Sequence, residues 1–122
     1  MAKKILIVDD EPDILDFVST RLKSWGYEVI MASDGEKAVA VARDQMPDLI
    51  LLDVMMPCKD GYETCNEIKS EESTSRIPIV LFTAKPQQQE RLKSNYEFIA
   101  ADDYIMKPFE PENLLAKVKK FI

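Results

Sequence analysis

The sequence predicts an α/β domain whose five-stranded parallel sheet is doubly wound, with helices on both faces. Short aliphatic runs alternate along the chain with segments that have the apolar spacing of helices, in five units of roughly 25 residues each. The central run, Asp48–Pro57, contains four consecutive aliphatic residues closed by Asp53, which suits a strand buried on both faces of a parallel sheet. Right-handed crossovers then place the intervening helices on the two faces.

The first unit pairs a short strand with a helix. Ile5–Val8 is an aliphatic run, and the helix after it is expected to begin near Pro12, because proline is favoured in a first helical turn. Gly26 follows this helix as a stop. The apolar residues that recur within it at helical spacing are Ile14, Leu15, Phe17, Val18 and Leu22.

The second and third units follow the same pattern. Tyr27–Met31 is predicted as a strand, Ser33–Glu36 opens a helix, and Pro47 forbids the continuation of that helix. The aliphatic run that ends at Asp53 is the third strand, and Asp60–Glu63 leads into the third helix.

The last two units follow a polar stretch, Ser70–Ser75, that is typical of an exposed loop. Ile77–Phe82 is the fourth strand, with its proline near the start, where a missing backbone donor is tolerated. A mostly polar helix is expected over Pro86–Ile99, and Asp103–Met106 is the fifth strand. The final helix begins at Pro111.

Length and composition indicate one globular domain over residues 1–122. Hydrophobic side chains make up 46% of the chain and charged ones 31%, a balance typical of folded and not of disordered proteins. The net charge of −6 argues against direct binding to nucleic acid, because such proteins present a basic surface to the phosphate backbone. The chain has no histidine, which removes catalytic triads that need imidazole and argues against zinc.

Cysteine usage and hydropathy point to the cytoplasm. Cys58 and Cys65 match neither a disulfide framework nor the spacing of a zinc or thioredoxin site, so we expect two free thiols. The N-terminal apolar run ends after four residues at Asp9, too early for a signal peptide. No segment reaches the length of a membrane span, and we expect no membrane partner.

Reactive side chains lie where the predicted strands end. Asp9 and Asp10 follow the first strand, Asp53 ends the third, Thr83 closes the fourth, and Lys107 follows the fifth. Because the carboxyl ends of parallel strands meet at one edge of a sheet, we expect these side chains to converge on one crevice. Taken singly they have simpler interpretations, as helix caps, a strand-forming threonine and a surface lysine. Their common position is what favours a shared site.

Three carboxylates in one crevice require a cation. Two carboxylates about 4 Å apart repel by about 4 kcal/mol at an effective dielectric constant near 20. An all-oxygen site that leaves room for water and for a phosphate suits Mg²⁺.

Several motifs of the chain resemble the receiver domain of two-component response regulators. The resemblance covers nearly the whole chain, and its motifs are highly specific. They are Ile5–Glu11, Asp48–Pro57, Asp60–Gly61, Thr83–Ala84, Ala101–Tyr104 and Lys107–Phe109. The family's fold implies a flavodoxin-like sheet in the strand order 2-1-3-4-5, flanked by five helices.

The resemblance also implies the role of each site residue. Asp53 would be the nucleophile that takes a phosphoryl group from a histidine kinase or a histidine phosphotransfer protein. Asp10, Asp53 and the backbone carbonyl of Met55 would ligate Mg²⁺, and Asp9 would act through a bound water. Thr83 and Lys107 would hold phosphoryl oxygens.

A switch is implied as well. Tyr104 would turn inward once Thr83 moves toward the phosphoryl group, and the face made by the fourth helix, fifth strand and fifth helix would control a downstream effector. The resemblance implies a signalling domain that assists its own phosphorylation and dephosphorylation, and not an enzyme. It would be a monomer or a phosphorylation-dependent homodimer, either as a stand-alone regulator or as the receiver part of a longer protein.

Met55 and Lys85 flank the predicted path of hydrolysis. Neither has an amide or carboxylate that would orient an attacking water, so we expect slow loss of the phosphoryl group. Two departures from the family pattern bear on the output surface. Ala100 stands where many members have glycine, and Lys59 replaces a commonly apolar residue.

Three other functions share this fold class or its acidic strand ends. A flavin-binding protein would need a small-residue phosphate loop after the first strand, where Asp9 and Asp10 would repel phosphate. A metal-dependent aspartyl phosphatase would place its nucleophile after the first strand with a second acid two residues on, which Asp9–Pro12 does not match. A phosphate-independent interaction module has little reason to keep all five site residues.

Overall fold

A computed structural model describes residues 2–57, 59–83 and 100–122. The predicted helix over Pro86–Ile99, together with Cys58 and Lys85, lies outside the described residues. In chain order the elements are β1 (Lys4–Val8), α1 (Pro12–Ser24), β2 (Glu28–Ala32), α2 (Gly35–Gln45), β3 (Leu49–Asp53), α3 (Gly61–Ser70), β4 (Ile79–Thr83), β5 (Asp103–Met106) and α5 (Pro111–Phe121).

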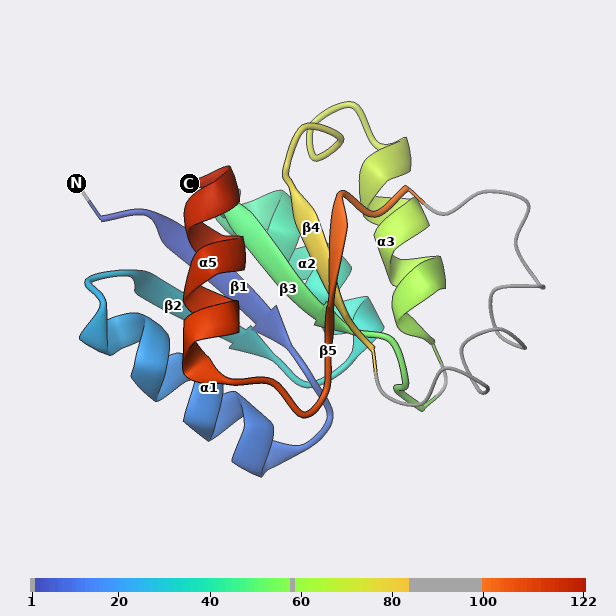
Figure 1. Ribbon diagram of the computed structural model, residues 1–122. Coiled ribbons are helices and arrows are strands. Elements are labelled where there is room, and N and C mark those ends of the chain that lie inside the picture. The colour runs from blue at the N-terminus through green and yellow to red at the C-terminus, as the bar shows by residue number, and fades with distance from the viewer. Residues whose placement is uncertain (1, 58, 84–99) are drawn as a thin grey trace.

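The strands form one parallel sheet in the order β2-β1-β3-β4-β5, which confirms the predicted fold class and strand order. β1 pairs with β2 on one side and with β3 on the other, so that Ile5 lies opposite both Val29 and Leu49. Helices α1 and α5 cover one face of the sheet, and α2 and α3 cover the other (Figure 1). Four helices are therefore present among the residues that the structure describes.

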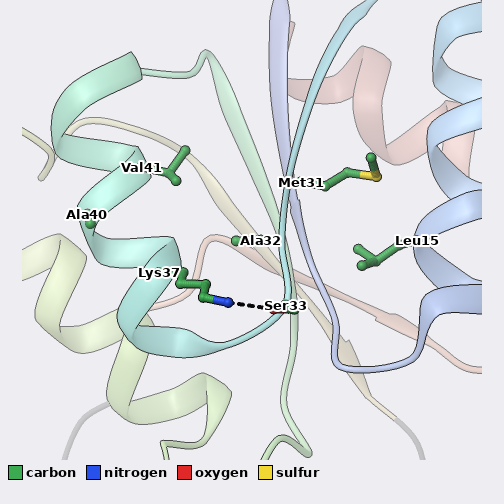
Figure 2. Close-up of a pocket in the computed structure, with 7 residues that line it drawn as sticks. All are labelled: Leu15, Met31, Ala32, Ser33, Lys37, Ala40 and Val41. Atoms are coloured by element: carbon green, nitrogen blue, oxygen red, sulfur yellow. Dashed lines mark hydrogen bonds between the residues drawn. The ribbon is translucent and has the colours of Figure 1, made fainter.

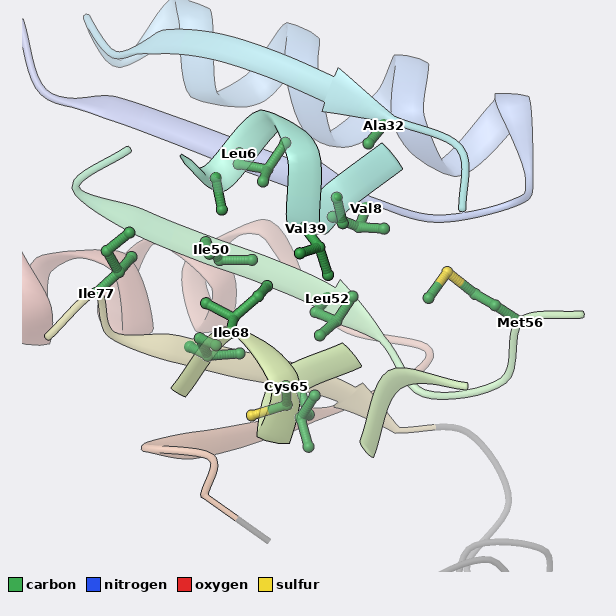
Figure 3. Packing of buried hydrophobic residues seen from close by; sticks show 14 of the residues in the cluster. Leu6, Val8, Ala32, Val39, Ile50, Leu52, Met56, Cys65, Ile68 and Ile77 are labelled. Atoms are coloured by element: carbon green, nitrogen blue, oxygen red, sulfur yellow. The ribbon is translucent and has the colours of Figure 1, made fainter. Parts of the chain in front are cut away.

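Each face of the sheet has its own hydrophobic core, because successive residues of a strand point to opposite faces. Ile5 and Ile7 of β1 pack under α1 and α5, whereas Leu6 and Val8 pack under α2 and α3. Figure 3 shows the second of these clusters, with side chains of β1 and β3 directed at the two helices. All five residues of β3 are buried, which explains its uninterrupted aliphatic run. Each fully buried aliphatic side chain contributes roughly 1.5–3 kcal/mol.

Cys65, in α3, lies inside this second cluster. Its side chain is fully buried and forms no disulfide, which confirms the predicted free thiol.

Two helices begin at aspartate caps close to the carboxyl edge of the sheet. Asp34 Oδ1 accepts a hydrogen bond from Lys37 N at 2.8 Å, and Asp60 Oδ1 accepts one from Glu63 N at 2.9 Å. Such caps contribute about 1 kcal/mol each. Helix α1 begins at Pro12, as predicted.

Two local predictions need correction. β4 begins at Ile79, two residues later than predicted, because Pro78 has no N–H to donate; its carbonyl accepts from Ile50 N. Within the predicted exposed loop, Thr74 is buried, since its hydroxyl donates to the Ile68 carbonyl at 2.6 Å. Among the apolar residues at helical spacing in α1, Phe17 is 40% exposed, and the Arg21 guanidinium lies over its ring.

Candidate functional site

The carboxyl ends of four adjacent strands bring the predicted site residues to one edge of the sheet. Asp9 directly follows β1, and Asp53 is the last residue of β3. Thr83 is the last residue of β4, and Lys107 directly follows β5. Because β1, β3, β4 and β5 are consecutive neighbours in a parallel sheet, these positions meet despite sequence separations of up to 98 residues.

Three carboxyl groups form an acidic cluster at this edge. Asp9, Asp10 and Asp53 each offer an oxygen, and these atoms lie within 4.8 Å of one another. Asp9 is fully buried and Asp53 nearly so, whereas Asp10 is exposed and faces solvent. The Glu11 backbone N–H donates to Asp9 Oδ1 at 3.0 Å, which holds that carboxylate in place. Clustered carboxylate oxygens are the ligands that hard divalent cations prefer, so the residues present fit a metal such as Mg²⁺.

Lys107 joins the two buried carboxylates. Its Nζ lies 2.8 Å from Asp9 Oδ2 and 3.2 Å from Asp53 Oδ1, and the side chain is only 16% exposed. The backbone N–H of Lys107 donates to the Thr83 carbonyl at 2.6 Å, so the same residue is held at both its main chain and its side-chain end. The ammonium group is therefore fixed in position beside Asp53.

The surroundings of Asp53 change its proton affinity. Burial, together with the charges of Asp9 and Asp10, raises the pKa of Asp53 to about 6, although Lys107 acts in the opposite direction. Burial would lower the pKa of Lys107, but its hydrogen bonds and its attraction to Asp9 and Asp53 raise it overall. Near pH 7 most Asp53 side chains are therefore ionised, beside the ammonium group of Lys107.

Thr83 and Tyr104 lie on the same face of the sheet. Thr83 is buried, and its hydroxyl is 3.4 Å from the Ile105 carbonyl, a long and weak hydrogen bond. Tyr104 pairs with Leu81, two residues before Thr83, and packs half-buried against the α2 and α3 side of the core. The two residues predicted to switch are therefore neighbours along one surface.

A family model described as "Response regulator receiver domain" matches residues 5–119 of this chain. The chain belongs to the response regulator receiver family. This confirms the predicted family, and with it a domain of the kind used as a phosphorylation-activated switch in two-component signalling.

The receiver domain is similar to several named proteins. A probable transcriptional regulator ycf27 of Pyropia yezoensis is 46% identical over 98% of this chain and 47% of that protein. The DNA-binding dual master transcriptional regulator RpaA of Synechocystis sp. is 42% identical over 98% of this chain and 48% of that protein. The chain thus spans about half the length of the curated relatives it matches.

A solved receiver domain with a metal ion is also similar. The receiver of the sensor histidine kinase PA1611 from Pseudomonas aeruginosa, described with a magnesium ion coordinated in the active site cleft, has a TM-score of 0.88 and 33% identity. The match covers 99% of this chain and 98% of that one.

The structure says less about the two remaining predicted residues of the site, Met55 and Lys85. Met55 lies two residues beyond Asp53, and its side chain is 41% exposed. The role of its backbone carbonyl as a metal ligand stays a prediction, as does the water-mediated role of Asp9. Lys85 is outside the described residues. None of the described helices has the length and apolar character needed to cross a membrane.

The two departures from the family pattern have partners of their own. Lys59 turns toward α3, where its Nζ lies 2.7 Å from Glu67 Oε1. The Ala100 backbone N–H donates to Asn66 Oδ1 at 2.9 Å, which ties the start of the β5 segment to α3.

Gly61 supports the site. The sequence placed it at a helix start and in a motif of the receiver resemblance, but predicted no structural role for it. Its backbone N–H donates to the Val54 carbonyl at 2.8 Å, directly after the end of β3. A Cβ at this position would lie 2.3 Å from the Asp53 carbonyl oxygen and 2.7 Å from Val54 Cα. Only glycine lets the start of α3 approach the end of β3 so closely.

We predict that Gly61→Ala costs about 3 kcal/mol of folding stability, because the clash is with backbone atoms that cannot move aside easily. It should also displace Asp53 and slow phosphorylation. Chemical denaturation measures the first effect. The matched control, Pro111→Ala, alters the first residue of α5 away from the site and should cost less than about 1 kcal/mol. Equal losses in the two variants would contradict the prediction.

Proposed function

We propose that this receiver domain accepts a phosphoryl group on Asp53 from a phosphohistidine of a histidine kinase or of a histidine phosphotransfer protein. A carboxylate oxygen of Asp53 would attack phosphorus, the phosphorus–nitrogen bond would break, and the imidazole would leave. The observation that best supports this reaction is the ammonium group of Lys107, held between the buried carboxylates of Asp9 and Asp53.

The ionisation of Asp53 suits a nucleophile. With a pKa of about 6, most Asp53 side chains are ionised near pH 7, so no separate base is needed to remove a proton. The carboxylate also sits at the end of a fully buried strand, which fixes its direction of attack.

We propose that Mg²⁺ is the cofactor, held by Asp10, Asp53 and the Met55 carbonyl, with Asp9 acting through water. When bound, the cation would neutralise charge that develops on the transferring phosphoryl group. Lys107 would release its contact with Asp53 and bind a phosphoryl oxygen, and the Thr83 hydroxyl would donate to another. This domain is a signalling module that would assist its own phosphorylation and dephosphorylation.

The output is proposed to depend on Thr83 and Tyr104. Movement of Thr83 toward the phosphoryl group would open space on the shared face, and the Tyr104 ring would turn into it. The surface around β5 and α5 would then bind an effector or a second copy of the chain. The shift between the two states would depend on how differently this partner binds each of them. Since the named relatives are regulators of transcription, we propose the same kind of output, in the cytoplasm, with residues 1–122 forming one receiver domain.

Incubation with acetyl phosphate and Mg²⁺ tests the proposal. Intact-protein mass spectrometry should show one added phosphoryl group that hydroxylamine removes, as expected for an acyl phosphate. A chelator should suppress the addition. An unmodified protein that instead releases phosphate catalytically from a small phosphomonoester would indicate an aspartyl phosphatase and overturn the assignment.

We further predict a long-lived phosphoprotein, because Met55 and Lys85 would not orient a hydrolytic water. Introducing Met55→Asn together with Lys85→Glu should speed loss of the phosphoryl group by roughly ten- to a hundredfold, equivalent to about 1.4–2.7 kcal/mol of barrier. The decay is followed by mass spectrometry after removal of the phosphodonor. Met46→Asn, at an exposed methionine remote from the site, is the control and should decay like the parent.

A further inference from the structure

Phe82 lies between the strand that ends in Asp53 and the strand that leads to Lys107. In the register of the sheet, Phe82 pairs with Asp53 on one side and with Ile105 on the other. Paired residues of neighbouring strands direct their side chains to the same face, here the face covered by α1 and α5. Because Lys107 directly follows β5, its side chain must cross the end of β4, above Phe82, to reach Asp53.

The ammonium group of Lys107 lies over the ring of Phe82. Its Nζ is 5.8 Å from the ring centroid, within the range in which the negative face of an aromatic ring attracts a cation. Phe82 is fully buried and the Lys107 side chain is largely so, which excludes most water from the contact and strengthens the attraction. An aliphatic side chain in the same place would fill the space but would offer the buried charge no compensating interaction.

A second aromatic ring supports the ring of Phe82. The ring centroids of Phe82 and Phe109 are 5.1 Å apart, and the two ring planes are inclined by 35°. Aromatic rings attract each other at this separation. Phe109 follows Lys107 by two residues and packs against the core under α1 and α5. The segment that carries Lys107 therefore also helps to orient the ring beneath its ammonium group.

We propose that Phe82 is a positioning residue for phosphorylation, whose ring keeps the ammonium of Lys107 above the end of β4 when Lys107 releases Asp53. This inference rests on the proposed function, in which Lys107 exchanges that contact for one with a phosphoryl oxygen. The ion pairs with Asp9 and Asp53, at 2.8 and 3.2 Å, depend on the positions of single oxygen atoms. Attraction to a ring face changes more gradually with position, so the ring can hold the ammonium throughout the exchange.

A role of Phe82 in filling the core alone predicts a different result. If the ring only occupies space, a ring of nearly the same size with a weaker face potential would serve equally well. Fluorine atoms withdraw electron density from the face of a phenyl ring and change its size little. Fluorinated phenylalanines in place of Phe82 therefore separate the attraction of the ring for Lys107 from its packing.

The first measurement is the rate of phosphorylation by acetyl phosphate and Mg²⁺, in whole chains in which Phe82 carries one, two or three ring fluorines. The rate should fall with each added fluorine, by about fivefold for the trifluorinated ring. The matched control is the same series at Phe121, where Lys120 Nζ lies 5.5 Å from the ring centroid at the end of α5. That series weakens a similar contact away from the site and should leave the rate unchanged.

The second measurement needs no phosphoryl group. Asp53→Ala removes one ion pair of Lys107, which leaves Asp9 and Phe82, among the residues described around the ammonium, to hold it. In this background, the order parameter of the Lys107 side chain is obtained from carbon-13 relaxation at Cε. It should fall when the trifluorinated ring replaces the parent ring, and fall further in Phe82→Leu.

Val41→Ala is the control for loss of apolar volume. Val41 packs against the core on the other face of the sheet, where it lines a groove of about 390 Å³ together with Leu15 and Met31 (Figure 2). Its truncation should lower stability, as Phe82→Leu does, but should leave both the order parameter of Lys107 and the phosphorylation rate unchanged.

Two results would overturn the proposal. They are equal phosphorylation rates across the fluorinated series at Phe82, or an order parameter of Lys107 that does not change with the ring. A parent protein that takes up no phosphoryl group would overturn the proposed function, and with it the role of Phe82 in phosphorylation. The order parameter would still decide whether the ring holds the ammonium. Circular dichroism of each variant excludes loss of the fold as the reason for a change.

Discussion

An Asp53→Asn variant should take up no phosphoryl group, and it should also resist unfolding better than the parent at pH 8. The amide lacks a nucleophilic oxygen anion, so incorporation from acetyl phosphate should fall below about 1% of the parent's. The amide also carries no charge to repel Asp9, and its oxygen can still accept from Lys107. The residue that carries the proposed chemistry therefore weakens the fold that holds it.

The pH dependence of folding stability follows from the direction in which the pKa of Asp53 is shifted. The pKa of Asp53 is raised to about 6 from 3.8, so the folded protein binds the proton more tightly than the unfolded chain. Its contribution to stability is present below about pH 4 and is lost as pH rises through 6. The full loss is about 3 kcal/mol, which Asp53→Asn should recover at pH 8 but not at pH 4.

Urea denaturation at the two pH values, with a chelator present, measures this difference. Asp103→Asn is the matched control. Although burial acts to raise the pKa of Asp103, hydrogen bonds from Lys120 and Lys117 lower it overall, so losing this carboxylate should destabilise the protein at pH 8. If Asp53→Asn gains no stability at pH 8, the ionised carboxylate of Asp53 does not destabilise the folded protein, and the prediction is wrong.

Lys107→Met should destabilise the protein by about 3 kcal/mol at pH 8 without metal, since it leaves two buried carboxylates without their cation. The methionine side chain has a similar length, so packing changes little. Without Lys107 the pKa of Asp53 should rise further, and the loss of stability should therefore shrink as pH falls toward 4. Phosphorylation should fall steeply as well.

A double-mutant cycle separates charge from packing. In the Asp53→Asn background, Lys107→Met should cost at least about 1 kcal/mol less than in the parent. Lys117→Met removes a lysine from an ion pair with Asp103 near the surface and should cost about 1 kcal/mol or less. Equal costs for the two lysines would show that the buried position of Lys107 has no special effect.

The fold was predictable because its strands are buried on both faces and carry uninterrupted aliphatic runs. The convergence of Asp53 and Lys107 was also predictable, since parallel strands share one edge. The different environments of Asp9 and Asp10 were not. Both are aspartates after the same strand, but consecutive residues leave the strand in opposite directions, so that one is fully buried and the other exposed.

Contacts within turns and loops were harder to predict. The polarity of Thr74 indicated exposure, yet a single hydrogen bond to a helix carbonyl is enough to bury it. Gly61 is important because the start of α3 passes within van der Waals contact of the backbone at the end of β3. The local sequence of neither segment encodes this close approach.

The buried thiol of Cys65 makes it a reporter of global opening. Burial raises its pKa to about 12, so only about one thiol in ten thousand is ionised at pH 8, and the folded core admits no reagent. In a Cys58→Ser background, alkylation of Cys65 would then proceed only through molecules that have transiently unfolded. With enough reagent for alkylation to outpace refolding, the alkylation rate would equal the unfolding rate and so give the lifetime of the native state, under the same conditions in which phosphorylation is measured.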